Sequence, residues 1–459
     1  MTLMQNLREA RVTVVGLGIE GIDLVRYLAA EGARVTVSDR RPASDLTEAL
    51  AAIEGCDATL SLGANRPEDA ATADAVFVSQ GVPSDNPAVL AAQQAGVPIS
   101  SMLGLFLERC PAPVTGITGS AGKTTTTALV GAILQAEGVD HVVGGNIGVG
   151  LLSLLPSIRP ETRVVAEMSH SQLERVSTSP HLACVTNVTP NHLDRYTWDE
   201  YVALKRRIFE FQAAEDTAVF NLDNEVTRAF SRDAAGRVVT TSMHGSIPGD
   251  GAVLRDGRLV RIRDGEATAV VARDEVALRG EHNLENLLAA IAVTAELGIS
   301  VEAAARVART FAGVPHRLEP VATVRGVLYV NDSIATAPER TLAGLRAFGE
   351  RLVLILGGRD KNLPVQEMAQ EAARRCRAVI TFGESGPLYA RAVREAAGDA
   401  VALREVETVE ETVRAAAALA QAGDVVLFSP AATSFDQYPN FEIRGQAFRD
   451  AVHALEGGR

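Results

Sequence analysis

The sequence predicts an α/β protein of three domains, on three observations. Short β-branched runs alternate with alanine-rich helical stretches along most of the chain, as parallel sheets covered by helices require. Two glycine-rich loops, at residues 16–21 and 119–124, each follow such a run and precede a helical stretch. The length of 459 residues is too great for one ordinary core and suits two or three domains.

The expected strands are short apolar runs whose two faces are both buried. They are RVTVVGLG (11–18), ARVTVSD (33–39), AVFVS (75–79), VVAEMS (164–169), ACVTNVT (183–189), AVFNLD (218–223), RLVLILGG (351–358), AVITFG (378–383) and VVLFSP (425–430). Residues 245–280 differ, because Asp256-Gly257 and Asp264-Gly265 separate short alternating runs. Asp-Gly pairs favour tight hairpin turns, so this region predicts a small antiparallel β subdomain.

Two connectors set the expected domain boundaries. CPAPVTGITG (110–119) begins a new strand, loop and helix after a complete first α/β block, and FAGVPHRLEP (311–320) is a Gly- and Pro-containing link to the last block. The predicted domains are residues 1–106, 107–313 and 314–459, with 313–316 as a hinge between the second and third.

Composition excludes several classes of protein. The chain has 57 acidic and 44 basic residues, a net charge of −13, which disfavours a nucleic-acid or anionic-membrane partner, although such an excess is also common in cytosolic enzymes. Four scattered cysteines, without zinc spacing, predict reduced thiols: Cys56, Cys110, Cys184 and Cys376. No apolar run reaches the roughly 20 residues of a membrane span, and no cleavable leader is recognised. We expect a cytoplasmic protein with no membrane insertion.

The first glycine loop is a complete dinucleotide-binding fingerprint. Gly16, Gly18 and Gly21 lie between an expected strand and helix, and Asp39 ends the next strand. Glycines let backbone amides approach a pyrophosphate, and the carboxylate accepts a hydrogen bond from a ribose hydroxyl. The motif predicts a Rossmann-like sheet that binds a dinucleotide, with another nucleotide or a purely structural turn as alternatives.

The second glycine loop, GITGSAGKTTTT (116–127), predicts a P-loop mononucleotide-binding sheet. The strict pattern fails because Ile117 stands where it requires glycine. The shorter loop from Gly119 to Thr124 can still aim successive N–H groups at phosphate oxygens, with Lys123 as the cation and Thr124 as a Mg²⁺ ligand. A threonine-rich helix cap is the alternative.

Oxygen and nitrogen ligands for a hard metal follow two further strands. Glu167 ends a buried run, where a carboxylate is costly unless it meets a cation. Asn187, His192 and Asp194 follow the next. Since sites in parallel sheets form at the carboxyl ends of strands, Thr124, Glu167 and His192 are expected to converge. A salt bridge to arginine is the alternative for Glu167, and a helix-start hydrogen bond is the alternative for His192.

Several stretches together resemble one family, the ATP-dependent Mur ligases. In order they are GSAGKTTTT, GGNIG (144–148), EMSHSQLE, NVTPNHLDRY, EHNLEN, PHRLE, VNDSIAT, LGGRDK and SPAATSFDQYPNFEIRG. The match runs from residue 11 to about residue 450. The last two stretches and the N-terminal fingerprint are most similar to the branch of the family that adds D-glutamate.

The resemblance implies the following nucleotide and metal residues. The ATP site would comprise Gly119, Ser120, Ala121, Gly122, Lys123, Thr124, Thr125, Asn286 at the adenine, Arg317 and Asp332. Two Mg²⁺ sites would use Thr124, Glu167 and a carbamylated Lys205, with Lys123, His192 and Lys205 as the catalytic residues. Without the resemblance, Lys205 is expected on a helix surface.

The resemblance also implies two substrate sites. UDP-N-acetylmuramoyl-L-alanine would meet Ile19, Glu20, Asp39, Arg40, Arg41, Gly81, Asn146, Gln172 and His192. The fingerprint is then expected to hold a UDP-sugar in place of a nicotinamide cofactor. D-Glutamate would meet Lys361, Ser434 and Phe441. The C-terminal block would be a Rossmann-like α/β domain that binds the amino acid.

Four positions, in three segments, depart from the family pattern. His170 and Ser171 stand in a segment usually written S-S-F-Q, Ile334 replaces a common lysine, and Gln80 replaces a common proline. None of these departures removes an expected magnesium ligand, and each is expected to affect affinity at most.

The implied reaction is formation of an amide bond through an acyl phosphate and a tetrahedral intermediate, by a monomer. A sibling ligase that adds another residue, or a ligase similar to folylpolyglutamate synthetase, shares the P-loop and the modified lysine. Two other classes are a nicotinamide dehydrogenase, which would lack a P-loop, and a nucleotide-switch protein, which would hydrolyse ATP without depending on an amino acid.

Overall fold

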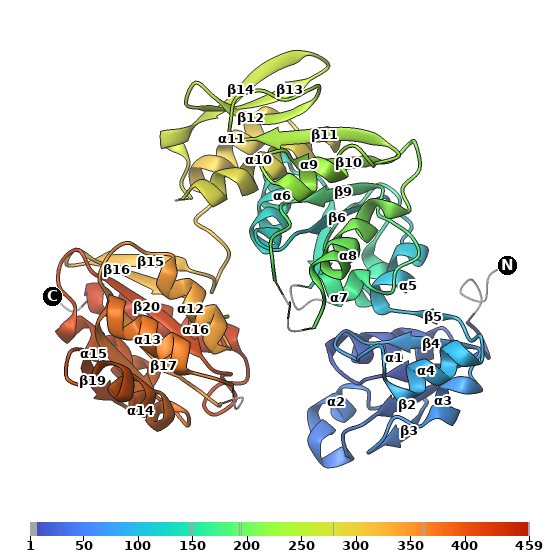
Figure 1. Ribbon diagram of the computed structural model, residues 1–459, viewed down its shortest axis with the longest axis horizontal. Coiled ribbons are helices and arrows are strands. Elements are labelled where there is room, and N and C mark those ends of the chain that lie inside the picture. The colour runs from blue at the N-terminus through green and yellow to red at the C-terminus, as the bar shows by residue number, and fades with distance from the viewer. Residues whose placement is uncertain are drawn as a thin grey trace. The chain divides into compact units, whose positions relative to one another are not determined.

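The computed structural model describes residues 7–146, 150–191, 193, 195–278, 280–360 and 363–457 (Figure 1). The chain divides into two compact units, Met1–Phe311 and Ala312–Arg459. The first unit contains two sheets and the second contains one, so the α/β architecture with three sheets is confirmed. The exact domain limits proposed from the sequence stay a prediction.

The N-terminal sheet has the Rossmann strand order β3-β2-β1-β4-β5 and is parallel throughout. Its strands are β1 (Arg11–Val15), β2 (Arg34–Asp39), β3 (Ala58–Leu62), β4 (Ala75–Val78) and β5 (Ile99–Ser100). Its helices are α1 (Ile19–Ala30), α2 (Thr47–Ala52), α3 (Pro67–Ala71), α4 (Pro87–Gln94) and α5 (Met102–Arg109), with a 3₁₀ turn at Ala43–Leu46. The strand order reverses between β1 and β4, where sheets of this type bind ligands.

The central sheet has nine strands in the order β14-β13-β12-β11-β10-β9-β6-β8-β7. They are β6 (Val114–Thr118), β7 (His141–Gly145), β8 (Arg163–Glu167), β9 (Leu182–Val185), β10 (Thr217–Asn221), β11 (Arg237–Ser242), β12 (Gly251–Arg255), β13 (Arg258–Arg263) and β14 (Glu266–Ala272). The helices are α6 (Lys123–Glu137), α7 (His170–Leu173), α8 (Trp198–Glu210), α9 (Glu225–Phe230), α10 (Glu281–Glu296) and α11 (Val301–Thr310), with 3₁₀ turns η3 (Leu152–Ser157) and η4 (Arg273–Glu275).

The antiparallel end of this sheet is the predicted hairpin region. Strands β12, β13 and β14 pair antiparallel and extend the parallel part beyond β11 (Figure 1). At the first turn Asp256 and Gly257 have φ of 49° and 70°, and at the second Asp264 and Gly265 have φ of 51° and 80°. Two consecutive positive φ values define the turn that Asp-Gly favours, so the prediction is confirmed with its physical reason.

The C-terminal sheet has the order β15-β16-β20-β17-β18-β19, and only the β15–β16 pair is antiparallel. The strands are β15 (Glu319–Val324), β16 (Val327–Asn331), β17 (Leu352–Gly357), β18 (Cys376–Phe382), β19 (Ala402–Glu405) and β20 (Val425–Ala431). The helices are α12 (Pro338–Arg346), α13 (Gln366–Arg375), α14 (Gly386–Ala397), α15 (Val409–Leu419) and α16 (Phe441–Gly457). One apolar cluster packs α12, α13 and α14 on the sheet, and a second packs α15 and α16 on it.

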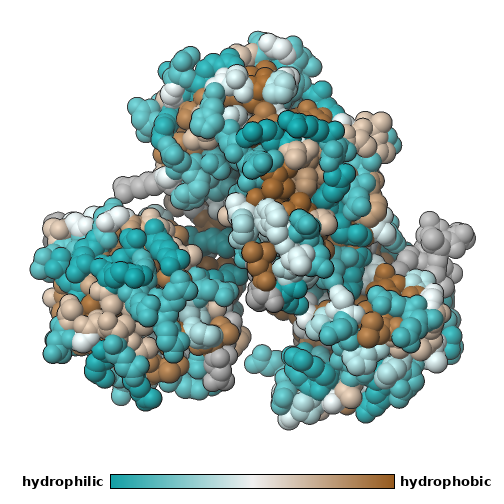
Figure 2. All heavy atoms as spheres, viewed as in Figure 1, coloured by the Kyte–Doolittle hydropathy of each residue, from teal (hydrophilic) through white to brown (hydrophobic). Residues whose placement is uncertain are grey.

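All nine apolar runs expected to be strands contain one. Edge strand β3 has one buried residue and edge strand β19 has none, so neither has a buried run by which the sequence could reveal it. Figure 2 shows a mostly hydrophilic visible face with apolar side chains dispersed over it. Across the part of the chain that the structure describes, we find no helix with the length and apolar character needed to cross a membrane.

Candidate active site

The loop between β6 and α6 has the backbone of a phosphate cradle. Gly119 and Gly122 have φ of 155° and 81°, and a Cβ on Gly119 would lie 2.0 Å from Thr186 Oγ1. Gly122 precedes α6 and no side chain caps that helix, so the amides of its first turn have no side-chain acceptor. Lys123 donates from Nζ to the carbonyl oxygens of Gly119 (2.9 Å) and Ser120 (3.2 Å). The cation therefore lies over the same loop.

Two residues beyond β9 hold this loop in place. Ser120 N–H donates to the carbonyl of Asn187 (2.9 Å), and Ala121 N–H donates to Asn187 Oδ1 (2.9 Å). Thr186 Oγ1 donates to the carbonyl of Ala121 (2.6 Å). The sequence placed Asn187 among the metal ligands, but here its amide is used to fix the loop. His192 and Asp194, from the same stretch, lie outside the described residues.

Glu167 lies at the end of β8, beside β6, and is 1% exposed. Its Oε1 accepts a hydrogen bond from Asn146 Nδ2 (3.0 Å), whereas Oε2 has no hydrogen-bond partner among the described residues. A buried carboxylate oxygen without a partner is costly, and a bound cation would remove that cost. Thr124 is the second residue of α6, at the same edge of the sheet. The partner of the Glu167 carboxylate is thus the Asn146 amide, and not the arginine that the alternative prediction expected.

Lys205 is buried, and the expectation of a helix-surface lysine is wrong. It is 1% exposed, because the apolar face of α8 packs against the core and turns this side chain toward β6. Its Nζ donates to Thr118 Oγ1 (3.1 Å) and to the carbonyl of Gly119 (2.9 Å). Burial, together with the cation of Lys123, holds the pKa of Lys205 well below its ordinary value. An amine that loses its proton more readily than an ordinary lysine therefore lies beneath the phosphate loop.

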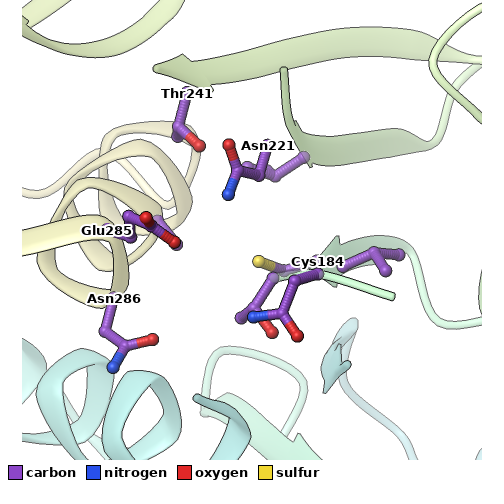
Figure 3. Close-up of a pocket in the computed structure, with 10 residues that line it drawn as sticks. Cys184, Asn221, Thr241, Glu285 and Asn286 are labelled. Carbon is purple, nitrogen blue, oxygen red and sulfur yellow. The ribbon is translucent and has the colours of Figure 1, made fainter. Parts of the chain in front are cut away.

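A pocket opens beside the loop at the carboxyl ends of β9, β10 and β11 (Figure 3). Asn286, on α10, is 5% exposed and its Oδ1 would lie 2.2 Å from a Cβ on Gly122. Asn221 and Thr241 line the same pocket from strands β10 and β11, and Glu285 lines it from α10, next to Asn286. Burial raises the pKa of Glu285. The residue predicted to meet adenine therefore lies both in the pocket and against the phosphate loop.

The N-terminal glycine loop has the close approach that its motif predicts. A Cβ on Gly21 would lie 2.1 Å from the carbonyl oxygen of Gly16, so only glycine fits there. Asp39 is 3% exposed and accepts hydrogen bonds from Leu17 N–H (2.8 Å) and from Arg41 Nε (3.0 Å). The Arg41 guanidinium helps hold the pKa of Asp39 below its ordinary value despite the opposing effect of burial. Asp39 here orients an arginine, and its carboxylate is already engaged.

Glu20, the second residue of α1, is also engaged within the protein. Its carboxylate accepts from Gln80 N–H (2.8 Å) and from Gln172 Nε2 (2.6 Å). Burial raises the pKa of Glu20 against these hydrogen bonds. The other residues predicted for the UDP-sugar surround this loop: Ile19, 68% exposed, the exposed Arg40, and Gly81 with φ of 88°.

In the second unit, predicted residues lie at the carboxyl ends of β16 and β20. Asp332 is 5% exposed and accepts from Leu318 N–H (3.1 Å) and Ser429 Oγ (2.7 Å). Burial raises the pKa of Asp332 to about 6. Ser434 is 2% exposed beyond β20, and Phe441 opens α16. The half-buried Arg317 precedes β15, and Lys361 lies outside the described residues.

Comparison with known proteins gives the family. Residues 10–101 match the Mur ligase MurD-like N-terminal domain, 117–294 the Mur ligase middle domain, and 316–432 the Mur ligase glutamate ligase domain. The UDP-N-acetylmuramoylalanine--D-glutamate ligase of Symbiobacterium thermophilum is 43% identical over 97% of this chain and 98% of that protein. The chain belongs to the Mur ligase family. A protein of the same name from Acetivibrio thermocellus is 38% identical to this Mur ligase, over 98% of each chain.

Solved structures agree with this Mur ligase in fold. The UDP-N-acetylmuramate-alanine ligase MurC of Thermotoga maritima gives a TM-score of 0.55 at 20% identity, over 98% of this chain and 100% of that chain. MurF of Acinetobacter baumannii gives a TM-score of 0.55 at 19% identity, over 82% and 85%.

The site of this Mur ligase fits a magnesium nucleotide. A Cβ would fill the cradle at Gly119 or Gly122, and Glu167 presents an unpartnered buried oxygen. Within the described ranges no group of three His, Cys, Asp or Glu side chains is placed to hold a metal ion. Hydroxyl, carboxylate and phosphate oxygens are the ligands that Mg²⁺ prefers, so such a cluster is not required.

Arg444 of this Mur ligase lies in the NFEIRG segment, whose sequence gives no role for it. Arg444 is 0% exposed and donates to the carbonyl oxygens of Ser333 (2.8 Å), Ala432 (3.0 Å) and Gly357 (3.4 Å). Those carbonyls follow or end β16, β20 and β17, so one side chain joins three loops at the edge that carries Asp332 and Ser434. An arginine in an otherwise ordinary helix start is too weak a signal to reveal this from sequence.

Proposed function

We propose that this chain catalyses the ATP-dependent addition of D-glutamate to UDP-N-acetylmuramoyl-L-alanine, in cytoplasmic peptidoglycan precursor synthesis. The named relatives support the substrates, because the match covers nearly the full length of both chains. The observation that carries the chemistry is the grouping at one edge of the central sheet. A glycine cradle, Lys123, a Glu167 oxygen without a partner among the described residues, and the buried Lys205 with its lowered pKa meet there.

The reaction needs an activated carboxyl group. A carboxylate resists attack by an amine, so the γ-phosphoryl group of ATP is first transferred to the terminal carboxylate of the UDP-linked substrate. The amine of D-glutamate attacks the resulting acyl phosphate, and the tetrahedral intermediate expels phosphate. The products are the amide, ADP and phosphate. Bound magnesium would neutralise charge on the phosphoryl oxygens.

The chain's own residues would act as follows in this proposal. Lys123 leaves the loop carbonyls to contact phosphate, together with the first-turn amides of α6, and each well-placed donor contributes about 3–4 kcal/mol in such sites. Thr124 and Glu167 would supply oxygen ligands to the metal. Asn286 would contact the adenine, while Arg317 and Asp332 would contact the nucleotide from the second unit.

Lys205 would carry a carbamate. Once deprotonated, its amine attacks CO₂, a nitrogen–carbon bond forms, and one proton leaves the nitrogen, so the side chain becomes an anion. The buried position and lowered pKa of the side chain support this modification. A second magnesium site would use this anion.

The substrate sites and domain limits are part of the same proposal. The N-terminal loop with Arg41 would bind the UDP group, and Asn146 and Gln172 would contact the rest of that substrate. Lys361, Ser434 and Phe441 would receive D-glutamate. The enzyme would act as a monomer of three domains, residues 1–106, 107–313 and 314–459.

Phosphate release tests the proposal directly. Enzyme, ATP, Mg²⁺ and UDP-N-acetylmuramoyl-L-alanine are combined with D-glutamate, L-lysine or meso-diaminopimelate in turn. Only D-glutamate should produce rapid phosphate release and a new amide. Equal release without an amino acid, or preference for another one, would assign the chain to a different activity or a sibling ligase.

A further inference from the structure

A closed ring of hydrogen bonds joins the N-terminal sheet to the edge of the central sheet, within the unit Met1–Phe311. Gln80 N–H donates to Glu20 Oε2 (2.8 Å), and Gln172 Nε2 donates to Glu20 Oε1 (2.6 Å). Ser169 N–H donates to Gln172 Oε1 (2.9 Å), and Gln80 Nε2 donates to Ser169 Oγ (3.2 Å). Glu20, Ser169 and Gln172 are buried, so three of the four members are fixed by packing.

A branch from this ring reaches Glu167. Gln80 Nε2 also lies 3.4 Å from Asn146 Oδ1, and Asn146 Nδ2 donates to Glu167 Oε1 (3.0 Å). A side-chain amide has one acceptor end and one donor end. Because Gln80 donates to the acceptor end of Asn146, the donor end faces the carboxylate.

The orientation of Asn146 decides how Glu167 is presented. With its donor end toward Oε1, the carboxylate is held by one oxygen and Oε2 stays without a partner. If the amide turned over, Asn146 Oδ1 would face Glu167 Oε1, and two acceptors would repel each other. Gln80 disfavours that arrangement, because its own donor would then face the donor end of Asn146.

We propose that Gln80 is a positioning residue of this ligase, which sets the orientation of Asn146 and through it presents Glu167 to the divalent cation. The inference rests on the proposed role of Glu167 as a metal ligand. It extends that role to a residue in the N-terminal sheet region that touches neither the metal nor the phosphates.

Gln80, which stands where proline is common in the family pattern, makes two hydrogen bonds that proline could not make. A proline at residue 80 has no N–H to donate to Glu20 and no side-chain amide to donate to Asn146. Gln80 supplies both donors from one residue. The link between the loop after β4 and Asn146 therefore depends on the glutamine at residue 80.

Mn²⁺ binding measures this link without any ligase turnover. The free Mn²⁺ signal in electron paramagnetic resonance is titrated with enzyme and ADP. Gln80→Met keeps the length of the side chain and the backbone N–H but removes the amide donor. We expect its Mn²⁺ Kd to rise about tenfold, as outer-shell substitutions commonly do.

A double-mutant cycle separates this mechanism from general damage. Glu167→Gln should itself weaken Mn²⁺ binding, and adding Gln80→Met to it should change the Kd by less than about twofold, because the effect travels through Glu167. Gln94→Met is the matched control, an exposed glutamine on α4, and should leave the Kd unchanged. Gln80→Glu, whose carboxylate cannot donate to Asn146 Oδ1, should weaken binding at least as much as Gln80→Met.

Three results would overturn the proposal. The first is an unchanged Mn²⁺ Kd in folded Gln80→Met and Gln80→Glu. The second is that adding Gln80→Met to Glu167→Gln weakens Mn²⁺ binding as much as it does in the wild type. The third is that Gln94→Met weakens Mn²⁺ binding as much as Gln80→Met does. If Glu167→Gln itself leaves Mn²⁺ binding unchanged, the metal role of Glu167 and the proposal fail together. If the wild-type enzyme does not ligate D-glutamate but the cycle behaves as expected, the assigned reaction fails and the role of Gln80 stands.

Discussion

Replacing Lys205 by methionine should abolish ligation and yet stabilise the protein in CO₂-free buffer. The side chain is 1% exposed, and among the described residues its amine donates hydrogen bonds to Thr118 Oγ1 and the carbonyl of Gly119. Neither group is left without a partner in the variant. Thr118 Oγ1 still donates to the carbonyl of Met168 (2.6 Å), and Lys123 Nζ still donates to Gly119 (2.9 Å).

The magnitude follows from the buried amine. Burying an amine that is charged in the unfolded chain costs stability. Replacing buried ionisable groups by apolar side chains of similar volume is often neutral or stabilising, by about 1–4 kcal/mol, and we expect a gain in this range near neutral pH. The pKa of Lys205 is lowered in the folded protein, so the unfolded chain binds more protons between that pKa and the ordinary lysine value. Wild-type stability therefore rises with pH in that window, by about 1.4 kcal/mol per pH unit, and the advantage of the variant shrinks.

The single tryptophan of the chain makes the assay local. Trp198 opens α8, the helix that carries Lys205, and it is half-buried against the same core. Urea unfolding followed by its fluorescence at pH 8 and pH 10, in CO₂-free buffer, gives the two free energies of unfolding. Between these pH values the advantage of the variant should fall by up to about 2.7 kcal/mol. Added bicarbonate should stabilise the wild type alone.

Two outcomes would refute this reasoning. One is a Lys205→Met protein less stable than the wild type at pH 8, and the other is a difference that does not change by pH 10. Arg206→Met is the matched control, because Arg206 lies next in α8 and pairs with Asp233 at the surface. Its effect on stability should not vary between the two pH values.

The remaining predictions concern the phosphate loop and the second unit. Lys123→Ala should lower phosphate release at least about 10³-fold, while calorimetry shows the affinity for the UDP-linked substrate within about threefold of the wild type. Gly122→Ala should abolish the thermal shift given by ATP and cost about 2–4 kcal/mol, since φ is 81° and Asn286 Oδ1 lies 2.2 Å from the new Cβ. Asp332→Asn should stabilise the protein at pH 7. Burial raises the pKa of Asp332 to about 6, so the folded state holds a costly charge above that pH, and the gain in urea unfolding should shrink between pH 7 and pH 5.

Matched controls make these outcomes decisive. Gly138→Ala, at the other end of α6, has nearly the same φ, 80°, but no atom within 4 Å of a new Cβ. Gly138→Ala should lose stability through backbone strain but keep ATP binding. Equal loss of ATP binding in Gly138→Ala and Gly122→Ala would contradict the steric argument. A gain for Asp332→Asn that is larger at pH 5 than at pH 7 would contradict the assigned direction of the pKa. Loss of UDP-substrate binding in Lys123→Ala would contradict the division of labour between the two loops.

Elements that form for local reasons can be predicted from the amino-acid sequence alone. Both glycine loops form because Gly16, Gly21, Gly119 and Gly122 meet backbone or side-chain atoms that no Cβ could tolerate, and the strand before each loop is a run of buried residues. The Asp-Gly pairs fixed the hairpins of the central sheet for the same kind of reason, a positive φ at consecutive positions. The direction of parallel strands then placed Glu167 and Thr124 at one edge.

Which polar side chains are buried, and what they contact, depends on segments that lie far apart in the sequence. Lys205 has the sequence context of a surface helix residue, and Glu20, Gln80 and Arg444 have no local signal of their bonds. The hydrogen-bond partners of Glu20 lie 60 and 152 residues away along the chain. Those of Lys205 lie 87 and 86 residues away. Burial changes a pKa or leaves an oxygen without a partner only when distant strands and helices exclude water together. A local pattern therefore cannot specify those properties.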